Sequence, residues 1–168
     1  MANTTFTGPV RSESTLKTIS KNSSTGAITE VITMGDGPVA LGDENKTLDN
    51  ATHSGRTLVV PALAANRTIT LPAPVAGAHF KFIYGGAAEE AENLILLTPG
   101  NSNFFLGGIV HLDSNADNVS VYSNGSSNSS LTLTDFGVFE INVVAKDSTN
   151  YYIWGYQEGA DVPAFADQ

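Results

Sequence analysis

Cysteine is absent from this chain of 168 residues, so the chain forms no disulfide framework and offers no thiolate ligand to a metal ion. Its stability must come from the burial of apolar side chains and from assembly. No stretch approaches the roughly 20 apolar residues that a membrane-spanning helix needs. The first residues, MANTTFTGPV, also lack the basic segment and apolar run of a secretory signal peptide.

Basic residues are scarce. The chain has 8 Lys and Arg against 17 Asp and Glu, which gives a formal charge of −9. Residues 1–34 carry +1 and the remainder carries −10, so the start of the chain differs electrostatically from the rest. Binding to nucleic acid needs clustered Lys and Arg, and binding to an anionic membrane surface needs the same. The composition therefore argues against both classes of partner.

Catalytic motifs are also missing. The sequence has no GxSxG elbow, Walker loop, HExxH or GxGxxG segment. The acidic residues Glu89, Glu90 and Glu92 cluster in one short segment, which is typical of a solvated acidic turn. We therefore predict a protein that is not an enzyme and that has neither catalytic residues nor a cofactor.

Metal ligands do not converge in the sequence. The three histidines, His53, His79 and His111, fall in separate predicted elements, and a metal site needs several ligands together. The segment that starts at Asp113 resembles the opening of an EF-hand calcium loop, but Asn118 stands where that loop needs glycine. We predict no metal site, with weak calcium binding through another loop geometry left open.

What the chain does have is β-structure, organised around residues 57–84. Three apolar runs, 57–60, 68–71 and 78–84, are each closed by proline or glycine, and we predict a strand for each. In the third run Phe80, Phe82 and Tyr84 alternate with His79 and Lys81, the period-two pattern of a half-buried strand.

Short strands are predicted along the rest of the chain, separated by turn clusters at the spacing of a sandwich or barrel. They cover residues 27–33, 93–98, 109–113, 118–123, 130–134, 138–144 and 151–156. Residues 39–55 are predicted to be a surface connection with one helical turn, and 85–93 to be a short helix. The fold class predicted is all-β: a single β-sandwich or jelly-roll-like domain over 27–156, an extended N-terminal arm over 1–26 and a C-terminal tail over 157–168.

The arm holds isolated apolar residues that are too sparse to bury a face of their own, so we expect it to become ordered against a partner. A frayed tail is the alternative. The candidate contacts in this segment are its apolar and basic residues: Phe6, Val10, Arg11, Leu16, Lys17, Ile19 and Lys21.

Aromatic residues alternate along the last predicted strand, so one set of side chains faces inwards and the other lies near the surface. Tyr152, Trp154 and Tyr156 are the candidate contacts on this strand. Exposed aromatic rings favour packing against a neighbouring subunit, and a carbohydrate-binding platform is the competing interpretation. Phe104 and Phe105, in a segment predicted to be rich in turns, are assigned to a core plug or a subunit contact.

The segments RTITLPAP, GAHFKFIY, FFLGGIVHLD, VYSNGSSNSSLTLTD and DSTNYYIWG, together with the opening TFTGPVRSE, resemble small β-rich virion proteins of tailed bacteriophages. The resemblance is to the head decoration, or cement, proteins of marine phages, and it covers residues 56–155 and the first dozen. TITLPAP and DSTNYYIWG also recur in phage tail fibres and other trimeric virion modules.

The resemblance implies a structural protein of the virion that lies on the outer surface of the capsid and is made in the host cytoplasm. Its implied partners are the major capsid protein, which the arm would contact, and further copies of itself in a homotrimer. The alternative is a receptor-binding or fibre-tip module that recognises bacterial surface glycans. A virion-associated hydrolase is a third possibility, disfavoured because the sequence has no catalytic constellation.

Overall fold

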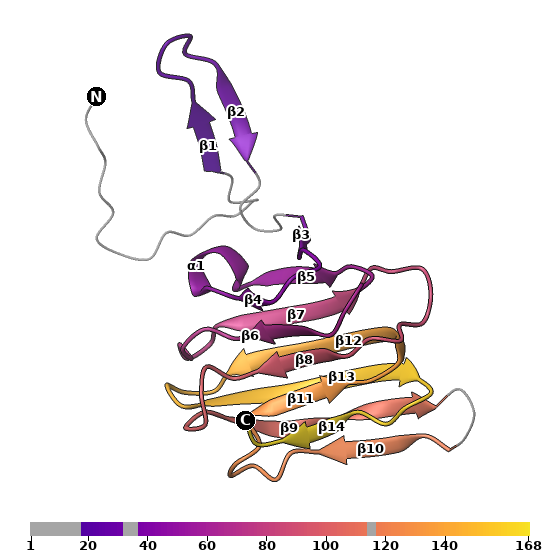
Figure 1. Cartoon of the computed structure of the whole chain (residues 1–168). Helices are drawn as coiled ribbons and strands as arrows, with labels where there is room; N and C mark the ends of the chain where they lie inside the picture. Colours follow the sequence, from indigo (N-terminus) through magenta and orange to yellow (C-terminus); the bar gives the residue numbers. More distant parts are fainter. Residues whose placement is uncertain (1–17, 32–36, 114–116) are drawn as a thin grey trace. The chain divides into compact units, whose positions relative to one another are not determined.

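The computed structural model describes residues 18–31, 37–113 and 117–168 (Figure 1). The chain divides into two compact units, Met1–Asp36 and Gly37–Gln168, which are described separately.

The N-terminal unit contains a β-hairpin. Strand β1 (Thr18–Lys21) pairs antiparallel with β2 (Ile28–Val31). In the turn, the side-chain oxygen of Asn22 accepts hydrogen bonds from the backbone N–H groups of Ser24 at 2.9 Å and Thr25 at 3.0 Å, a common way for Asn to stabilise a turn. The strand predicted within 27–33 is confirmed, but it pairs inside this unit and not with the body. The boundary of the unit lies at Asp36 and Gly37, ten residues after the predicted end of the arm.

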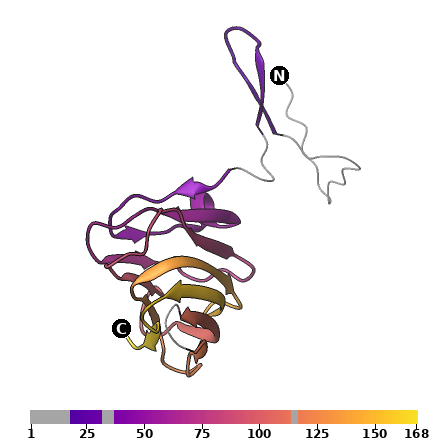
Figure 2. The same cartoon turned by 90° about the vertical axis from the view of Figure 1, so that its right-hand side faces the viewer.

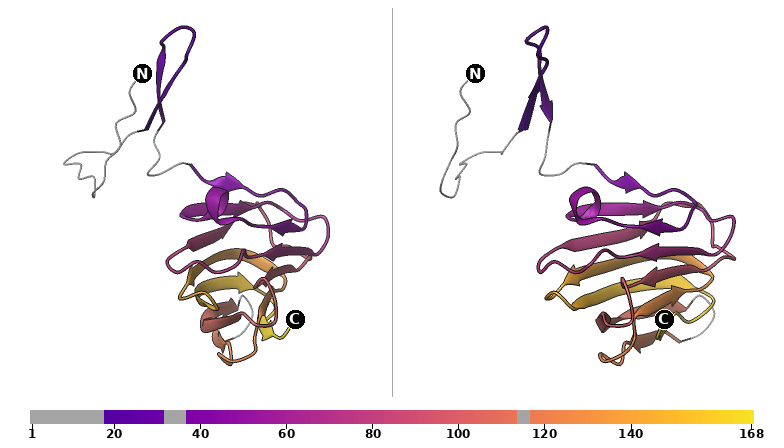
Figure 3. Two further views of the ribbon diagram at one scale, coloured as in Figure 1. Left: turned by 90° about the vertical axis from the view of Figure 1, so that its left-hand side faces the viewer. Right: turned by 60° about the vertical axis from the view of Figure 1, so that its left-hand side comes forward.

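The body, Gly37–Gln168, contains two sheets and confirms the all-β sandwich-like prediction (Figures 2 and 3). The larger sheet has the strand order β10 (Val119–Tyr122), β9 (Phe104–Asp113), β13 (Asn150–Gly159), β12 (Phe136–Ala145), β7 (His79–Tyr84), β5 (Arg56–Val60), β3 (Val39–Ala40). The smaller sheet has the order β14 (Ala164–Ala166), β11 (Ser130–Leu133), β8 (Leu94–Leu97), β6 (Arg67–Thr70), β4 (Lys46–Thr47).

Alternating side chains build the core between the sheets. On β12, Phe139, Ile141 and Val143 are buried, while the residues between them face the other way. Phe80 and Phe82 are buried on β7 as predicted. The segment Phe104–Phe105 is not turn-rich but begins the ten-residue strand β9.

Two predictions about helices have different outcomes. A helical turn, α1 (Asn50–His53), lies in the connection where one was predicted, and the Asp49 side chain caps it by accepting from the Thr52 N–H at 2.7 Å. The helix predicted over 85–93 is wrong. Glu90 is only 8% exposed, and its carboxylate accepts from the Leu63 N–H at 3.1 Å and from the Tyr84 hydroxyl. These contacts hold the segment in an irregular path despite the helix propensity of its Ala and Glu residues.

The predicted C-terminal tail is also wrong. Residues 157–159 complete β13, and β14 pairs antiparallel with β11. Phe165 packs edge-on against Phe105, with 6.2 Å between ring centroids. Gln168 donates from its side-chain amide to the Thr98 carbonyl at 2.9 Å, and its N–H donates to the Ser129 hydroxyl. These contacts fix the end of the chain to the smaller sheet, although its short apolar pattern gives little signal of a strand.

Candidate binding face

Strand β13 divides its aromatic residues between two faces. Tyr151 is fully buried, and its hydroxyl donates to the Pro72 carbonyl at 2.6 Å. Tyr152, Trp154 and Tyr156 lie on the opposite face and are 45%, 48% and 36% exposed. The structure therefore brings these three candidate contact residues together on the outer face of the larger sheet.

Neighbouring strands extend this apolar surface. The register of β9, β10 and β12 against β13 and one another places four more large apolar side chains on the same side of the sheet. We call the set the outer face: Val110, Leu112, Tyr122, Val138, Tyr152, Trp154 and Tyr156, each between 36% and 71% exposed. With residue areas on the order of 150–250 Å², these fractions correspond to roughly 650 Å² of exposed surface. This is above the 300–600 Å² typical of the largest apolar patch on a monomer, so the outer face is a candidate binding surface.

A groove of about 720 Å³ crosses the outer face. Gly108 is the register partner of Tyr122 on one side and of Trp154 on the other, so the two aromatic residues stand on strands that flank a glycine floor. A Cβ atom at Gly108 would lie 2.3 Å from the Val121 carbonyl oxygen and 2.6 Å from the Tyr122 ring. Only glycine fits at this point, because its lack of a side chain lets the β10 backbone and the Tyr122 ring lie close against β9.

Polar groups lie along one side of the groove. Glu140 is the register partner of Tyr156, and Asn142 that of Trp154. Lys81 contacts the Glu140 carboxylate at 2.9 Å, and the Asn142 side-chain amide donates to the same carboxylate at 3.2 Å. The hydrogen bond from Lys81, with that from Asn142, lowers the pKa of Glu140. The groove therefore combines aromatic walls with a carboxylate that is ionised and held in place.

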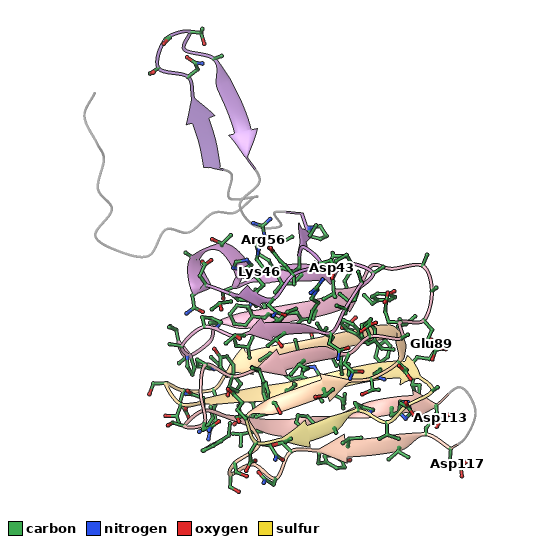
Figure 4. All side chains as sticks on the ribbon, in the orientation of Figure 1. Asp43, Lys46, Arg56, Glu89, Asp113 and Asp117 are labelled. Carbon is green, nitrogen blue, oxygen red and sulfur yellow. The ribbon has the colours of Figure 1, made fainter. Side chains whose placement is uncertain are left out.

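An acidic rim lies at the end of the body where β12 begins and β13 ends. The Asp135 and Asp161 side chains share a hydrogen bond, which is the main cause of a raised pKa for Asp135, and Glu89 adds to it. The Glu89 carboxylate, labelled in Figure 4, accepts from the Ala160 N–H at 3.0 Å. Among the described residues, no group of three or more His, Asp or Glu side chains is placed to hold a metal ion.

The histidines stay apart in the fold. His111 is fully buried on β9, and its Nε2 lies 3.0 Å from the Gly159 carbonyl oxygen. His53 is buried in α1, where its Nδ1 lies 3.1 Å from the Asp49 carboxylate. His79 begins β7 and is exposed. In the EF-hand-like segment the Asn118 side chain accepts from the Asp113 N–H at 3.1 Å, and residues 114–116 between them lie outside the described residues.

The candidate contacts of the arm are not tested by the structure. Phe6, Val10, Arg11, Leu16 and Lys17 lie outside the described residues. Ile19 and Lys21 belong to β1, of which only the backbone is described.

Sequence reasoning missed half of the groove. Tyr122, Gly108 and Asn142 come from strands that were predicted or partly predicted, but nothing in a single sequence indicates that β9 pairs in parallel with β13. The usable signal was the alternation of side chains along β13. If Tyr151 and Ile153 face inwards, the residues between and after them must face outwards.

Comparison with known proteins gives no relative from which to argue. No protein family, no curated protein and no solved structure matches the chain. Within the described ranges, no helix is long and apolar enough to cross a membrane.

Proposed function

We propose that this chain is a structural protein of a tailed-phage virion, a head decoration protein that binds the outer surface of the capsid through its N-terminal unit. The observation that carries the proposal is the division of the chain at Asp36 and Gly37, which separates two units of different charge. Residues 1–36 hold three basic and three acidic residues and are neutral, whereas the body holds five basic and fourteen acidic residues and has a formal charge of −9.

The two units would suit two different roles, one that binds the capsid and one that extends into solvent. The neutral unit offers apolar side chains, with Phe6, Val10 and Leu16 among them, that do not suffice to form a core alone. Copies bound side by side on a shell would hold their acidic bodies apart by like-charge repulsion. The sequence resemblance to decoration proteins points to the same arrangement.

Stabilisation of the shell would follow from mass action. Contacts that exist only with the assembled, expanded lattice favour that lattice over its ruptured state by an amount that grows with the concentration of the decoration protein. Association of three copies, as the resemblance implies, would present three anchors at once and raise the effective affinity. No catalytic step takes part in this function.

Co-sedimentation with expanded capsids tests the proposal. The full chain should sediment with capsids to saturation, whereas a variant lacking residues 1–36 should stay in the supernatant. Circular dichroism and the urea midpoint of the truncated variant should match those of the full chain, because the body has its own core. Val162→Ser is the matched control, since Val162 is an exposed residue of the body outside the candidate contacts, and its replacement should leave sedimentation unchanged. Full decoration by the truncated variant would contradict the proposal.

Sedimentation equilibrium of the full chain tests the trimer. A mass near three times 17.6 kDa is expected, and a monomer at micromolar concentration would remove self-association from the proposal.

A further inference from the structure

We propose that the groove between Tyr122 and Trp154 binds a neutral saccharide. This would be a second binding activity, carried by the body and independent of the capsid contact proposed for the N-terminal unit. The groove crosses four strands of the larger sheet and is therefore held by a rigid framework.

The distribution of aromatic residues supports this class of ligand. The body places phenylalanine inside: the five fully buried phenylalanine residues are Phe80, Phe82, Phe105, Phe136 and Phe139. The outer face carries only tyrosine and tryptophan among its aromatic residues. These rings have an apolar surface and a polar edge, so they suit a ligand that is apolar on one side and hydroxylated around its rim. A sugar ring has this character, with C–H groups on its faces and hydroxyl groups at its edge.

The shape of the groove fits a flat ring. Tyr122 and Trp154 flank Gly108, so the floor between the two aromatic residues carries no side chain. Val110 and Leu112 continue the apolar wall along β9. A volume of about 720 Å³ falls within the 300–1,000 Å³ usual for small-ligand sites and accommodates more than one sugar ring.

Hydrogen-bonding groups lie where sugar hydroxyl groups would need them. Glu140 and Asn142 line the groove beside Tyr156 and Trp154. Their mutual hydrogen bond and the Lys81–Glu140 ion pair fix both side chains, so little conformational entropy would be lost on binding. Carboxylate and amide groups that flank aromatic walls give orientation and specificity to a mainly apolar site.

Charge argues against acidic sugars as ligands. The residues that line the groove, all in the described part of the chain, include no Lys or Arg. Lys81, the cation next to Asn142 in register, is engaged by Glu140. An acidic saccharide would find no further cation among the lining residues to pair with its own charge and should bind poorly.

A second copy of the chain is the main competing occupant. The face is hollowed by the groove, whose space a close sheet-to-sheet contact would need to fill. This hollow favours a small ligand.

Trp154 provides the assay, because it is the only tryptophan in the chain and lies in the groove. The full-length protein would be titrated with neutral oligosaccharides of the glucose, galactose, mannose and N-acetylglucosamine series, with tryptophan emission as the readout. We expect saturable changes with at least one series. Tyr122→Ala, at a residue that is 71% exposed, should weaken that binding at least about tenfold by removing one stacking ring.

Val162→Ser is the matched control, because Val162 is an exposed apolar residue away from the groove, and it should leave the affinity unchanged. An oligogalacturonate should bind more weakly than the best neutral sugar. The absence of a saturable signal from every neutral series would overturn the proposal. So would an oligomer of the full chain that dissociates on Trp154→Ala, since a second copy would then cover the face. None of these measurements involves capsids, so their failure leaves the capsid proposal standing.

Discussion

Gly155 should be among the least replaceable residues of the body. Its φ is +151°, a conformation that side-chain-bearing residues rarely adopt, and a Cβ there would lie 2.0 Å from the Glu140 carbonyl oxygen. Glu140 lies on the neighbouring strand β12, in the sheet interior, so its backbone cannot move aside without disturbing the β12–β13 ladder. A Gly155→Ala variant must therefore either strain β13 or separate the two strands.

The loss of stability can be estimated from the backbone strain at residue 155 and from the close contact with Glu140. An unfavourable backbone conformation costs about 1–2 kcal/mol, and overpacking against a fixed neighbour costs about 1–3 kcal/mol. Gly155→Ala should thus lower the free energy of unfolding by about 2–5 kcal/mol. With a urea m-value on the order of 2 kcal/mol per molar, the midpoint should fall by about 1–2.5 M.

Urea unfolding followed by far-ultraviolet circular dichroism measures this shift without relying on Trp154, which adjoins the substitution. Gly100→Ala is the matched control, because nothing lies within 4 Å of a Cβ at Gly100. It should change stability by less than about 1 kcal/mol. Overlapping curves for Gly155→Ala and the unaltered chain would refute the inferred contact between β12 and β13.

Three further predictions concern stability. Tyr151→Phe removes the hydroxyl that bonds the Pro72 carbonyl and leaves that oxygen without its partner, so urea unfolding should show a loss of about 1–3 kcal/mol. Phe165→Ala removes a ring that covers the core beside β14 and should cost about 1–3 kcal/mol by the same assay. Asp135→Asn should stabilise the protein at pH 7: the Asp161 side chain and burial raise the pKa of Asp135 from 3.8, so stability is lost as pH rises from that value through the raised pKa, and an uncharged amide avoids this loss.

Two of these predictions, for Tyr151 and Asp135, have controls. Tyr152→Phe, next to Tyr151 but exposed, should stay within about 0.5 kcal/mol of the unaltered chain. The gain from Asp135→Asn should disappear below about pH 3.8, where the carboxyl is protonated in both states. Asp147→Asn should have the opposite sign at pH 7, because N–H groups of Thr149 and Asn150 lower the pKa of Asp147. A gain that persists at low pH would exclude carboxylate repulsion as its cause.

The sequence predicts strands well where apolar alternation is bounded by glycine or proline. β7 follows from Phe80 and Phe82, and β13 from Tyr151 and Ile153. Period-two alternation is a local signal, and the pairing of strands is not. The parallel pairing of β9 with β13 joins residues that lie more than forty positions apart, and it places Trp154 beside Gly108 in the groove.

Two errors have physical causes in tertiary contacts. Glu90 favours a helix by its propensity, but its buried carboxylate bonds the Leu63 N–H and the Tyr84 hydroxyl, and these bonds decide the path of the segment. The three-residue strand β14 has too few residues to show a period, and it is held by Phe165 and by the hydrogen bonds of Gln168. A buried polar group or an aromatic ring with a fixed partner can therefore override the secondary-structure propensity of a short segment.

The place of β13 in the larger sheet has a consequence for how the protein is made. β13 lies between β9 and β12, so β9 and β10 cannot join the rest of that sheet until the segment Asn150–Gly159 has been synthesised. The smaller sheet gains β14 as an edge strand, and Gln168 bonds Thr98 and Ser129. Folding dominated by such distant pairings takes milliseconds to seconds. A chain that ends before Asn150 therefore lacks the strand that joins β9 and β10 to the rest of the larger sheet, and it cannot complete that sheet.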